Sequence, residues 1–371
     1  MLKSISNSDA AAVEAKALAK LHELLNPVPF VSFGAQSNEP ELAAGSWHPD
    51  LSVNLQAGGE SWRLIVDIKG DGQPRNVRYA ALQLKDYVQR FASADARAYP
   101  VVVAPFISPA SAEICKGAGI GFFDLAGNCH LAFNKVFIEK SVAGNPFRKR
   151  RVQRTIFSAK SARVLRLLLA EPHRLWRVAQ LAEKAQVSLG QVSNLRRRLL
   201  DEEWAVLEKD GLRLSKPREL LEAWSKAYRP DVESGESFYT LLHGESLDQA
   251  VRTALADASQ GQHAVLASYS AGRWLAPFAR TATLYLYADQ KGEAILREHL
   301  KLESSGKGGN VSLMRPKDAG VFLDRIEAAE GIWSTSPIQT YLDLAVSGER
   351  AAEAAEHLFN ERIAPRWKAG S

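Results

Sequence analysis

The spacing of apolar residues changes twice along the chain and divides it into three blocks. In the first block a helical pattern at 9–25 is followed by three short strand-like runs between 28 and 69, the last two joined by a Gly58-Gly59 turn. Further runs predict a helix at 76–93, a strand at 99–107, a short helix, and a strand at 119–133. The order helix, three strands, helix, strand, helix, strand predicts a three-layer α/β domain.

The second block has the spacing of a helix-turn-helix. SARVLRLLLAEP (161–172) predicts one helix, WRVAQLAEKAQ a second, VSLG a turn, and QVSNLRRRLLDEEW a third. Residues 204–215 predict two short strands about an Asp210-Gly211 turn, which would form a wing.

The third block contains LYLYAD (284–289), a predicted strand, and the helical patterns IQTYLDLA and GERAAEAAEHLFNERI. We therefore expect a multidomain protein of the α/β (α+β) class. Its predicted parts are a domain at 1–147, a basic linker at 148–158, a winged helix-turn-helix at 159–220 and a C-terminal α/β domain at 231–371.

Charge is concentrated in the second block. Residues 148–218 contain 18 Lys and Arg against seven Asp and Glu, a net charge of +11, although the whole chain of 371 residues carries only +5. Such a local field predicts a polyanionic partner. A winged helix that serves as a protein-interaction module remains the alternative.

The composition excludes other classes. No run approaches the roughly 18 apolar residues that cross a bilayer, so we expect a cytoplasmic protein with no membrane partner. Cys115 and Cys129 have apolar neighbours and suit neither a zinc site nor a disulfide framework.

The third helix of the helix-turn-helix carries the residue types that read DNA. Ser188 can cap it or contact a phosphate, Asn and Gln can pair with adenine in the major groove, and arginines can contact phosphates. The predicted DNA-binding residues are Ser188, Gln191, Ser193, Asn194, Arg196, Arg197, Arg198, Lys209, Arg213, Arg148, Arg150 and Arg151. Double-stranded DNA is the expected partner, and DNA binding requires no cofactor.

The strand-like run LIVDIKGDG (64–72) places Asp67 and Lys69 on one face, which in an ordinary strand is a surface ion pair. The hairpin before it can return Asp50 to Asp67. Two carboxylates can bind Mg²⁺, and a lysine can orient the attacking water. Gln83 and Tyr87 are one helical turn apart and could face the same site.

Pro49-Asp50, Asp67-Ile68-Lys69 and Gln83-Leu-Lys-Asp-Tyr87 resemble the motifs of the PD-(D/E)XK restriction-endonuclease-like superfamily. The resemblance implies a catalytic set of Asp50, Asp67, Lys69, Gln83 and Tyr87, with a metal held by Asp50 and Asp67. Such a core can also persist as a relic or as a DNA-docking surface. Asp124, Asn128 and His130 could be polar groups near this site. The preferred interpretation is that Asp124 and Asn128 belong to a turn and that His130 is a core histidine with its hydrogen bonds satisfied.

A wider resemblance covers most of the chain. Residues 67–84, 119–133, the winged helix and 336–358 are similar to transcriptional regulators of the AbiEi antitoxin type, from type IV toxin-antitoxin systems. This implies a protein that represses its own operon and opposes a nucleotidyltransferase-like toxin encoded nearby, without stable contact with it. The long N-terminal domain departs from the better-known members.

Three hypotheses follow. The chain is a DNA-binding regulator, a metal-dependent nuclease that the winged helix guides to DNA, or a mainly protein-binding antitoxin with an inert nuclease-like domain. A symmetric operator would favour a homodimer, although the sequence does not fix the oligomeric state.

Overall fold

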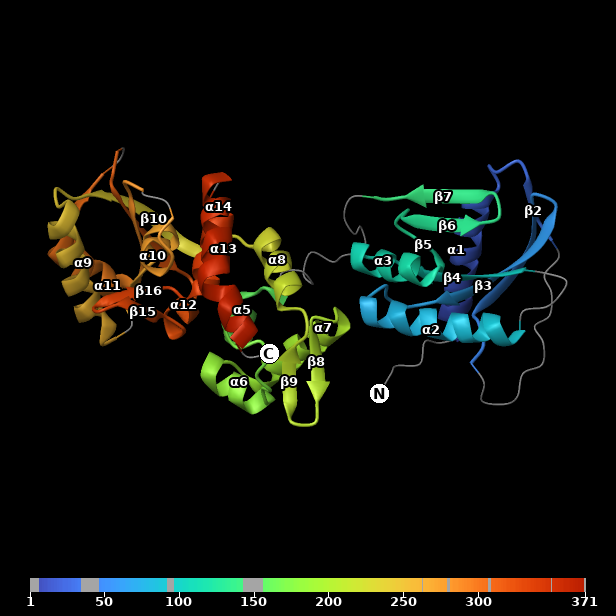
Figure 1. Cartoon of the computed structure of the whole chain (residues 1–371), viewed down its shortest axis with the longest axis horizontal. Coiled ribbons are helices and arrows are strands. Elements are labelled where there is room, and N and C mark those ends of the chain that lie inside the picture. Colours follow the sequence, from blue (N-terminus) through green and yellow to red (C-terminus); the bar gives the residue numbers. More distant parts are fainter. Residues whose placement is uncertain are drawn as a thin grey trace. The chain divides into compact units, whose positions relative to one another are not determined.

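The computed structural model describes residues 7–34, 47–91, 97–142, 156–261, 263–278, 281–305, 308–347 and 349–369. The chain forms two compact units, Met1–Arg151 and Val152–Ser371, which are described separately below (Figure 1).

The first unit is built on one mixed sheet of seven strands in chain order. The strands are β1 (Val31–Phe33), β2 (Leu51–Ala57), β3 (Glu60–Ile68), β4 (Arg97–Ala104), β5 (Gly121–Asp124), β6 (Cys129–Phe133) and β7 (Val136–Lys140). β3, β4 and β5 are parallel, and the other neighbours are antiparallel. The predicted hairpin is confirmed: Ala57 pairs with Glu60 across two glycines with positive φ. The single strand predicted at 119–133 is two strands, and β7 was missed.

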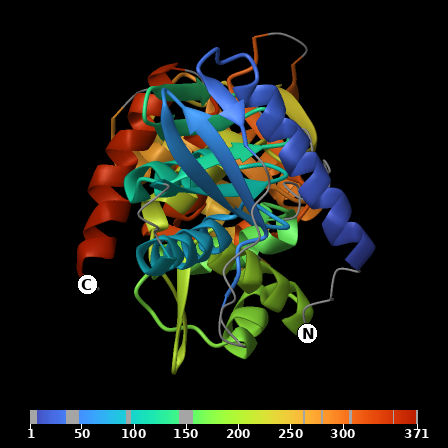
Figure 2. The same ribbon diagram turned by 90° about the vertical axis from the view of Figure 1, so that its right-hand side faces the viewer.

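Helices cover both faces of this sheet. The unit has three described helices, α1 (Asn7–Leu25), α2 (Pro74–Phe91) and α3 (Pro109–Ala118). Because strand side chains alternate, Leu64 and Val66 pack with α1 while Ile65 packs with α2 and α3. Figure 2 shows α1 in dark blue and α2 in light blue on opposite sides of the strands.

The second unit begins with a winged segment, the name used here for residues 159–227. It consists of α5 (Ala159–Ala170), α6 (Val178–Ala185), α7 (Leu189–Asp201), β8 (Ala205–Glu208), β9 (Gly211–Leu214) and α8 (Pro217–Ala227). The hairpin turns at Lys209 and Asp210, one residue earlier than predicted, because Gly211 already pairs with Glu208. A Cβ on Gly211 would lie 2.8 Å from the carbonyl oxygen of Trp176, which explains the glycine.

The C-terminal segment, residues 232–369, contains a second mixed sheet. Its strand order is β13-β10-β14-β12-β11-β16-β15. The strands are β10 (Val232–Tyr239), β11 (Ala264–Leu266), β12 (Leu284–Ala288), β13 (Glu303–Ser304), β14 (Val311–Pro316), β15 (Ile326–Ala329) and β16 (Ile332–Ser334). The helices are α9 (Gly244–Ser259), α10 (Ser268–Leu275), α11 (Gln290–Leu300), α12 (Gly320–Leu323), α13 (Pro337–Ala345), α14 (Glu349–Leu358), η1 (Phe359–Ile363) and α15 (Ala364–Ala369).

The winged segment and the C-terminal segment share one hydrophobic core. Leu165 and Leu195 of the former belong to the same buried cluster as Leu266 and Ile338 of the latter. The indole N–H of Trp367 donates to the carbonyl oxygen of Leu169 at 2.7 Å, which fixes α15 to the end of α5. The predicted α/β class is confirmed. No helix among the described residues is long and apolar enough to cross a membrane.

Candidate functional site

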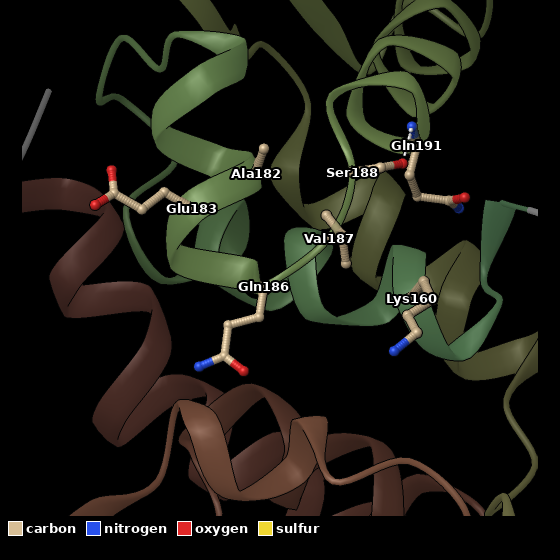
Figure 3. A pocket seen from close by; sticks show the side chains of 7 residues that line it. All are labelled: Lys160, Ala182, Glu183, Gln186, Val187, Ser188 and Gln191. Atoms are coloured by element: carbon tan, nitrogen blue, oxygen red, sulfur yellow. Dashed lines mark hydrogen bonds between the residues drawn. The ribbon is translucent and has the colours of Figure 1, made fainter.

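Helix α7 begins with a serine cap. The backbone N–H of Gln191 donates to the Ser188 hydroxyl at 3.2 Å, as the sequence predicted. This end of α7 borders a hollow of about 540 Å³ between α5, α6 and α7. Figure 3 shows its lining residues: Lys160, Ala182, Glu183, Gln186, Val187, Ser188 and Gln191.

One side of α7 is buried and the other is open. Val192, Leu195 and Leu199 point into the core. At 3.6 residues per turn, Gly190, Ser193, Asn194 and Arg197 fall on the opposite side, which we call the outward stripe. Asn194 and Arg197 are exposed and Ser193 is half-buried. The Arg197 guanidinium donates to the side-chain oxygen Oδ1 of Asn194 at 3.4 Å.

Two further arginines flank the outward stripe. Arg196 and Arg198 are each about 100° around the helix from Arg197, in opposite directions, and both are half-buried. The stripe is therefore bordered by a cation on each side.

Gln191 is placed differently from the stripe. Its side-chain amide donates to the Ser161 hydroxyl of α5 at 3.2 Å. The hydrogen bond holds the side chain toward α5, whereas the Asn194 side chain on the opposite side of α7 is exposed.

The wing supplies a second exposed surface. Lys209 lies in its turn and is exposed, as is Leu207, with 57% of its surface accessible. Arg213 is paired with Glu208 across the hairpin. Arg148, Arg150 and Arg151 lie outside the described residues.

Part of the positive charge of the winged segment is neutralised by carboxylates of the C-terminal segment. Arg166 is 3% exposed, and its Nε lies 2.9 Å from the Asp324 carboxylate of the C-terminal segment. Arg163 makes two hydrogen bonds to Asp318, at 2.7 and 3.0 Å. Both partners lie outside residues 148–218, so the net charge of +11 counted over that stretch overstates what it offers to a polyanion.

In the first unit, the predicted acidic site comes together. The Ile68 backbone N–H donates to Asp50 Oδ2 at 2.6 Å, which holds Asp50 at the end of β3. The Lys69 ammonium donates to Asp67 Oδ1 at 2.9 Å and lies 2.7 Å from Oδ2. Asp50 is exposed and Asp67 is 2% exposed, so the three charged groups meet at the rim of the sheet.

Burial raises the pKa of Asp67 to about 6. The hydrogen bond and the charge of Lys69 lower it, while a hydrogen bond shared with the Asp50 carboxyl and the charge of Asp50 raise it again. Two carboxyls this close repel each other when both are ionised, and a dication between them would relieve that repulsion. Asp67 Oδ2 has no hydrogen bond within the described part of the chain, despite its closeness to the ammonium.

Asp50 and Asp67 therefore fit a Mg²⁺ ion that keeps most of its water ligands, which is how this ion is commonly bound. Among the described residues no cluster of three or more His, Cys, Asp or Glu side chains offers a fuller set of ligands. A dication would also have to compete with the Lys69 ammonium for Asp67.

Gln83 and Tyr87 lie on α2, whose inner face packs on the sheet face that carries Ile65. Tyr87 packs edge-on against Trp47, with ring centroids 5.8 Å apart. The Gln83 Oε1 is buried and has no hydrogen bond among the described residues.

Asp124 and Asn128 form the predicted turn. Asp124 Oδ1 accepts the backbone N–H groups of residues 126, 127 and 128 at 2.7 to 2.9 Å, and Asn128 Nδ2 donates to Asp124 Oδ2 at 2.6 Å. His130 is half-buried, stacked on Phe122 and edge-on to Phe137. Its Nδ1 is buried and has no hydrogen bond to any residue that the structure describes, so, contrary to our expectation, the histidine is not fully satisfied.

A buried polar cluster that the sequence did not reveal joins the two segments of the second unit. Asp343 Oδ1 accepts from the hydroxyls of Tyr228 at 2.7 Å and Tyr287 at 3.1 Å, and from Gln339 at 3.0 Å. Burial raises the pKa of Asp343 to about 6, although these hydrogen bonds lower it. Gln339 in turn accepts from Arg166 at 3.1 Å. The short stretches IQT (338–340) and YLD (341–343) contain no local pattern that predicts this network.

A helix-turn-helix followed by a two-stranded wing, with a polar and cationic outward stripe on its last helix, is the architecture typical of DNA-binding regulators. Residues 213–364 match the family model described as "Transcriptional regulator, AbiEi antitoxin, Type IV TA system". The match supports the resemblance to type IV antitoxin regulators. It begins in β9 and spans most of the C-terminal segment, but it reaches neither α7 nor the first unit. Comparison with curated proteins and with solved structures gave no match.

Proposed function

We propose that the protein is a DNA-binding transcriptional regulator of the type IV antitoxin kind, which represses its own operon through α7. The observation that carries this proposal is the exposed outward stripe of α7, with Asn194 and Arg197 at its centre. The family match at 213–364 supports the regulator class independently of that helix.

The chemistry of α7 suits the major groove of duplex DNA. An α-helix fits the groove, and Asn can accept and donate in a bidentate pair with adenine. The flanking Arg196 and Arg198 would face the phosphate backbones on the two sides, where they fix register without reading sequence. Lys209 at the tip of the wing would contact a further phosphate. In this proposal Gln191 supports the helix through Ser161 and does not read a base.

The toxin side of the proposal rests on the family match. A type IV antitoxin would oppose a nucleotidyltransferase-like toxin encoded nearby without a stable complex. A homodimer would bind a symmetric operator through two copies of α7.

Fluorescence anisotropy tests the DNA-binding proposal. The full chain is titrated against a labelled duplex from upstream of its own gene and against an unrelated duplex of equal length. We expect Arg197→Ala to weaken binding to both, and Asn194→Ala to reduce mainly the preference for the upstream duplex, by about 1–3 kcal/mol. Lys291→Ala, which removes an exposed cation from α11, is the matched control and should change neither. Equal affinity of the wild type for both duplexes would remove the regulator proposal.

A second candidate function is supported by the convergence of Asp50, Asp67 and Lys69. It is metal-dependent cleavage of DNA phosphodiesters. Asp50 and Asp67 would hold Mg²⁺, which supplies charge stabilisation and an acidified water when bound. Lys69 would orient the water or stabilise charge that develops on the phosphate.

Incubation with Mg²⁺ or Mn²⁺ and with single-stranded, linear and supercoiled DNA tests this candidate. Cleavage should be lost in Asp67→Ala and Lys69→Ala, and kept in Asp86→Ala, which removes an exposed carboxylate paired with Arg90 on α2. DNA that stays intact in all three forms would exclude it and would leave the regulator proposal untouched.

A further inference from the structure

One carboxylate of the C-terminal segment holds two cations of the winged segment. Asp318 accepts two hydrogen bonds from Arg163, at 2.7 and 3.0 Å, and its Oδ2 lies 3.5 Å from the Lys160 ammonium. Burial would raise the pKa of Asp318, but the hydrogen bonds from Arg163 and from the Gly320 N–H outweigh this and lower it. Asp318 is therefore ionised at neutral pH.

The two cations lie beside the start of α7. Lys160 lines the same hollow as Ser188 and Gln191, and 56% of its side chain is exposed (Figure 3). Arg163 also donates to the carbonyl oxygen of Gln186 at 3.4 Å, in the turn between α6 and α7. The negative charge of Asp318 is thus placed where a phosphate that approaches the N-terminal end of α7 would meet Lys160.

A carboxylate in this position acts against DNA binding in two ways. It repels the phosphate backbone, and it pairs with the exposed Lys160, which would otherwise neutralise a phosphate and release its counterion; Arg163, with 10% of its side chain exposed, lies too deep to do so. We propose that Asp318 is an autoinhibitory contact, through which the C-terminal segment restrains DNA binding by the winged segment. This inference rests on the proposed function.

Helix α7 is held in place by apolar packing and not by Asp318. Val192, Leu195 and Leu199 anchor the helix in the core, with at most 2% of each residue exposed. The Asp318 side chain also accepts a hydrogen bond from the backbone N–H of Gly320 at 2.8 Å. An Asn or Ser side chain at this position can still accept that hydrogen bond. Removal of the charge also leaves Arg163, with 10% of its side chain exposed, without its charged partner, so some loss of stability is expected and folding is measured on the same samples.

The test compares variants that each remove one negative charge from the second unit. Asp318→Asn and Asp318→Ser remove the carboxylate that pairs with the exposed Lys160. Asp231→Asn is the matched control, because Asp231 pairs with Lys317 at 3.3 Å and both side chains are more than half exposed. The probes are a labelled duplex from upstream of the protein's own gene and an unrelated duplex of equal length, each titrated over a range of salt concentrations. Circular dichroism on the same samples reports folding.

We expect both Asp318 variants to bind both duplexes at least about threefold more tightly than Asp231→Asn, with a salt slope steeper by about 0.9 for each additional phosphate that the protein neutralises. Adding Lys160→Gln to Asp318→Asn should remove part of this increase in affinity. The inference is overturned if a folded Asp318 variant binds no more tightly than Asp231→Asn, or if both Asp318 variants lose their fold, since the residue is then structural. Absence of binding by every protein, wild type included, would instead refute the proposed function.

Discussion

Arg166 of α5 and Asp324 of the C-terminal segment form a buried ion pair, with the arginine Nε 2.9 Å from both carboxylate oxygens. The same guanidinium donates to the Gly320 carbonyl oxygen at 2.7 Å and to the Gln339 Oε1 at 3.1 Å. One side chain of the helix-turn-helix thus satisfies three separate acceptors of the neighbouring segment. The winged segment is held by the C-terminal segment through polar contacts as well as through their common core.

Arg166→Met should therefore lower the stability of the second unit strongly. The substitution keeps most of the side-chain volume but leaves the half-buried Asp324 and the Oε1 of the buried Gln339 without the donor that Arg166 supplies. Breaking a buried pair from one side costs about 3–5 kcal/mol. Urea denaturation followed by circular dichroism measures the change. Lys317→Met, which breaks an exposed pair with Asp231, should cost no more than about 1 kcal/mol, and equal effects of the two variants would contradict this account.

Asp67 should make the stability of the first unit depend on pH. Its folded pKa of about 6 lies above the ordinary value of 3.8, so the folded state binds the proton more tightly than the unfolded state. The resulting stabilisation is complete below about pH 4 and is lost as the pH rises through 6. Asp67→Asn removes this dependence, because an amide does not titrate.

The thermal midpoint measured between pH 4 and 7.5 checks this prediction. Relative to Asp67→Asn, the wild type should lose stability as the pH rises. Asp86→Asn, on the exposed side of α2, should follow the wild type. Parallel curves for wild type and Asp67→Asn would show that the carboxyl titrates normally.

Gly72 fixes the chain directly after the charged strand. A Cβ at this position would lie 2.0 Å from the Phe106 carbonyl oxygen, and the Gly72 carbonyl accepts the Ser111 hydroxyl at 2.6 Å. Gly72→Ala should therefore destabilise the first unit by about 1–3 kcal/mol or more. At Gly70, two residues earlier, a Cβ would meet nothing within 4 Å, so Gly70→Ala should stay within about 1 kcal/mol of the wild type. Chemical denaturation of the two variants side by side decides between them.

The local pattern of the sequence was sufficient for most elements of the first unit and of the winged segment, whereas in the C-terminal segment it predicted only β12, α13 and α14. The helix predicted at 161–172 is α5 at Ala159–Ala170, and the strand predicted at 284–289 is β12 at Leu284–Ala288. The hairpin pattern also predicted correctly that Asp50 would return to Asp67. Each of these depends on residues close in the sequence, where periodicity and turn chemistry act directly.

Contacts between distant residues could not be predicted in the same way. Arg163 and Arg166 look like part of a DNA-binding field in the sequence, yet their partners are Asp318 and Asp324. Gln191 looks like a base reader, and only the packing of α5 against α7 brings Ser161 to its amide. Side-chain partners at such separations follow from the tertiary fold and leave no periodic signal.

The central claim is that the outward stripe of α7 contacts duplex DNA, and cross-linking from position 194 tests it most directly. Asn194→Cys can be labelled selectively with a photoreactive maleimide, because both native cysteines are buried and burial raises the pKa of each thiol to about 12. Lys291→Cys is the control. Irradiation with the upstream duplex should give a protein–DNA adduct from position 194 and none from position 291. Bound DNA with no adduct from position 194 would contradict the account.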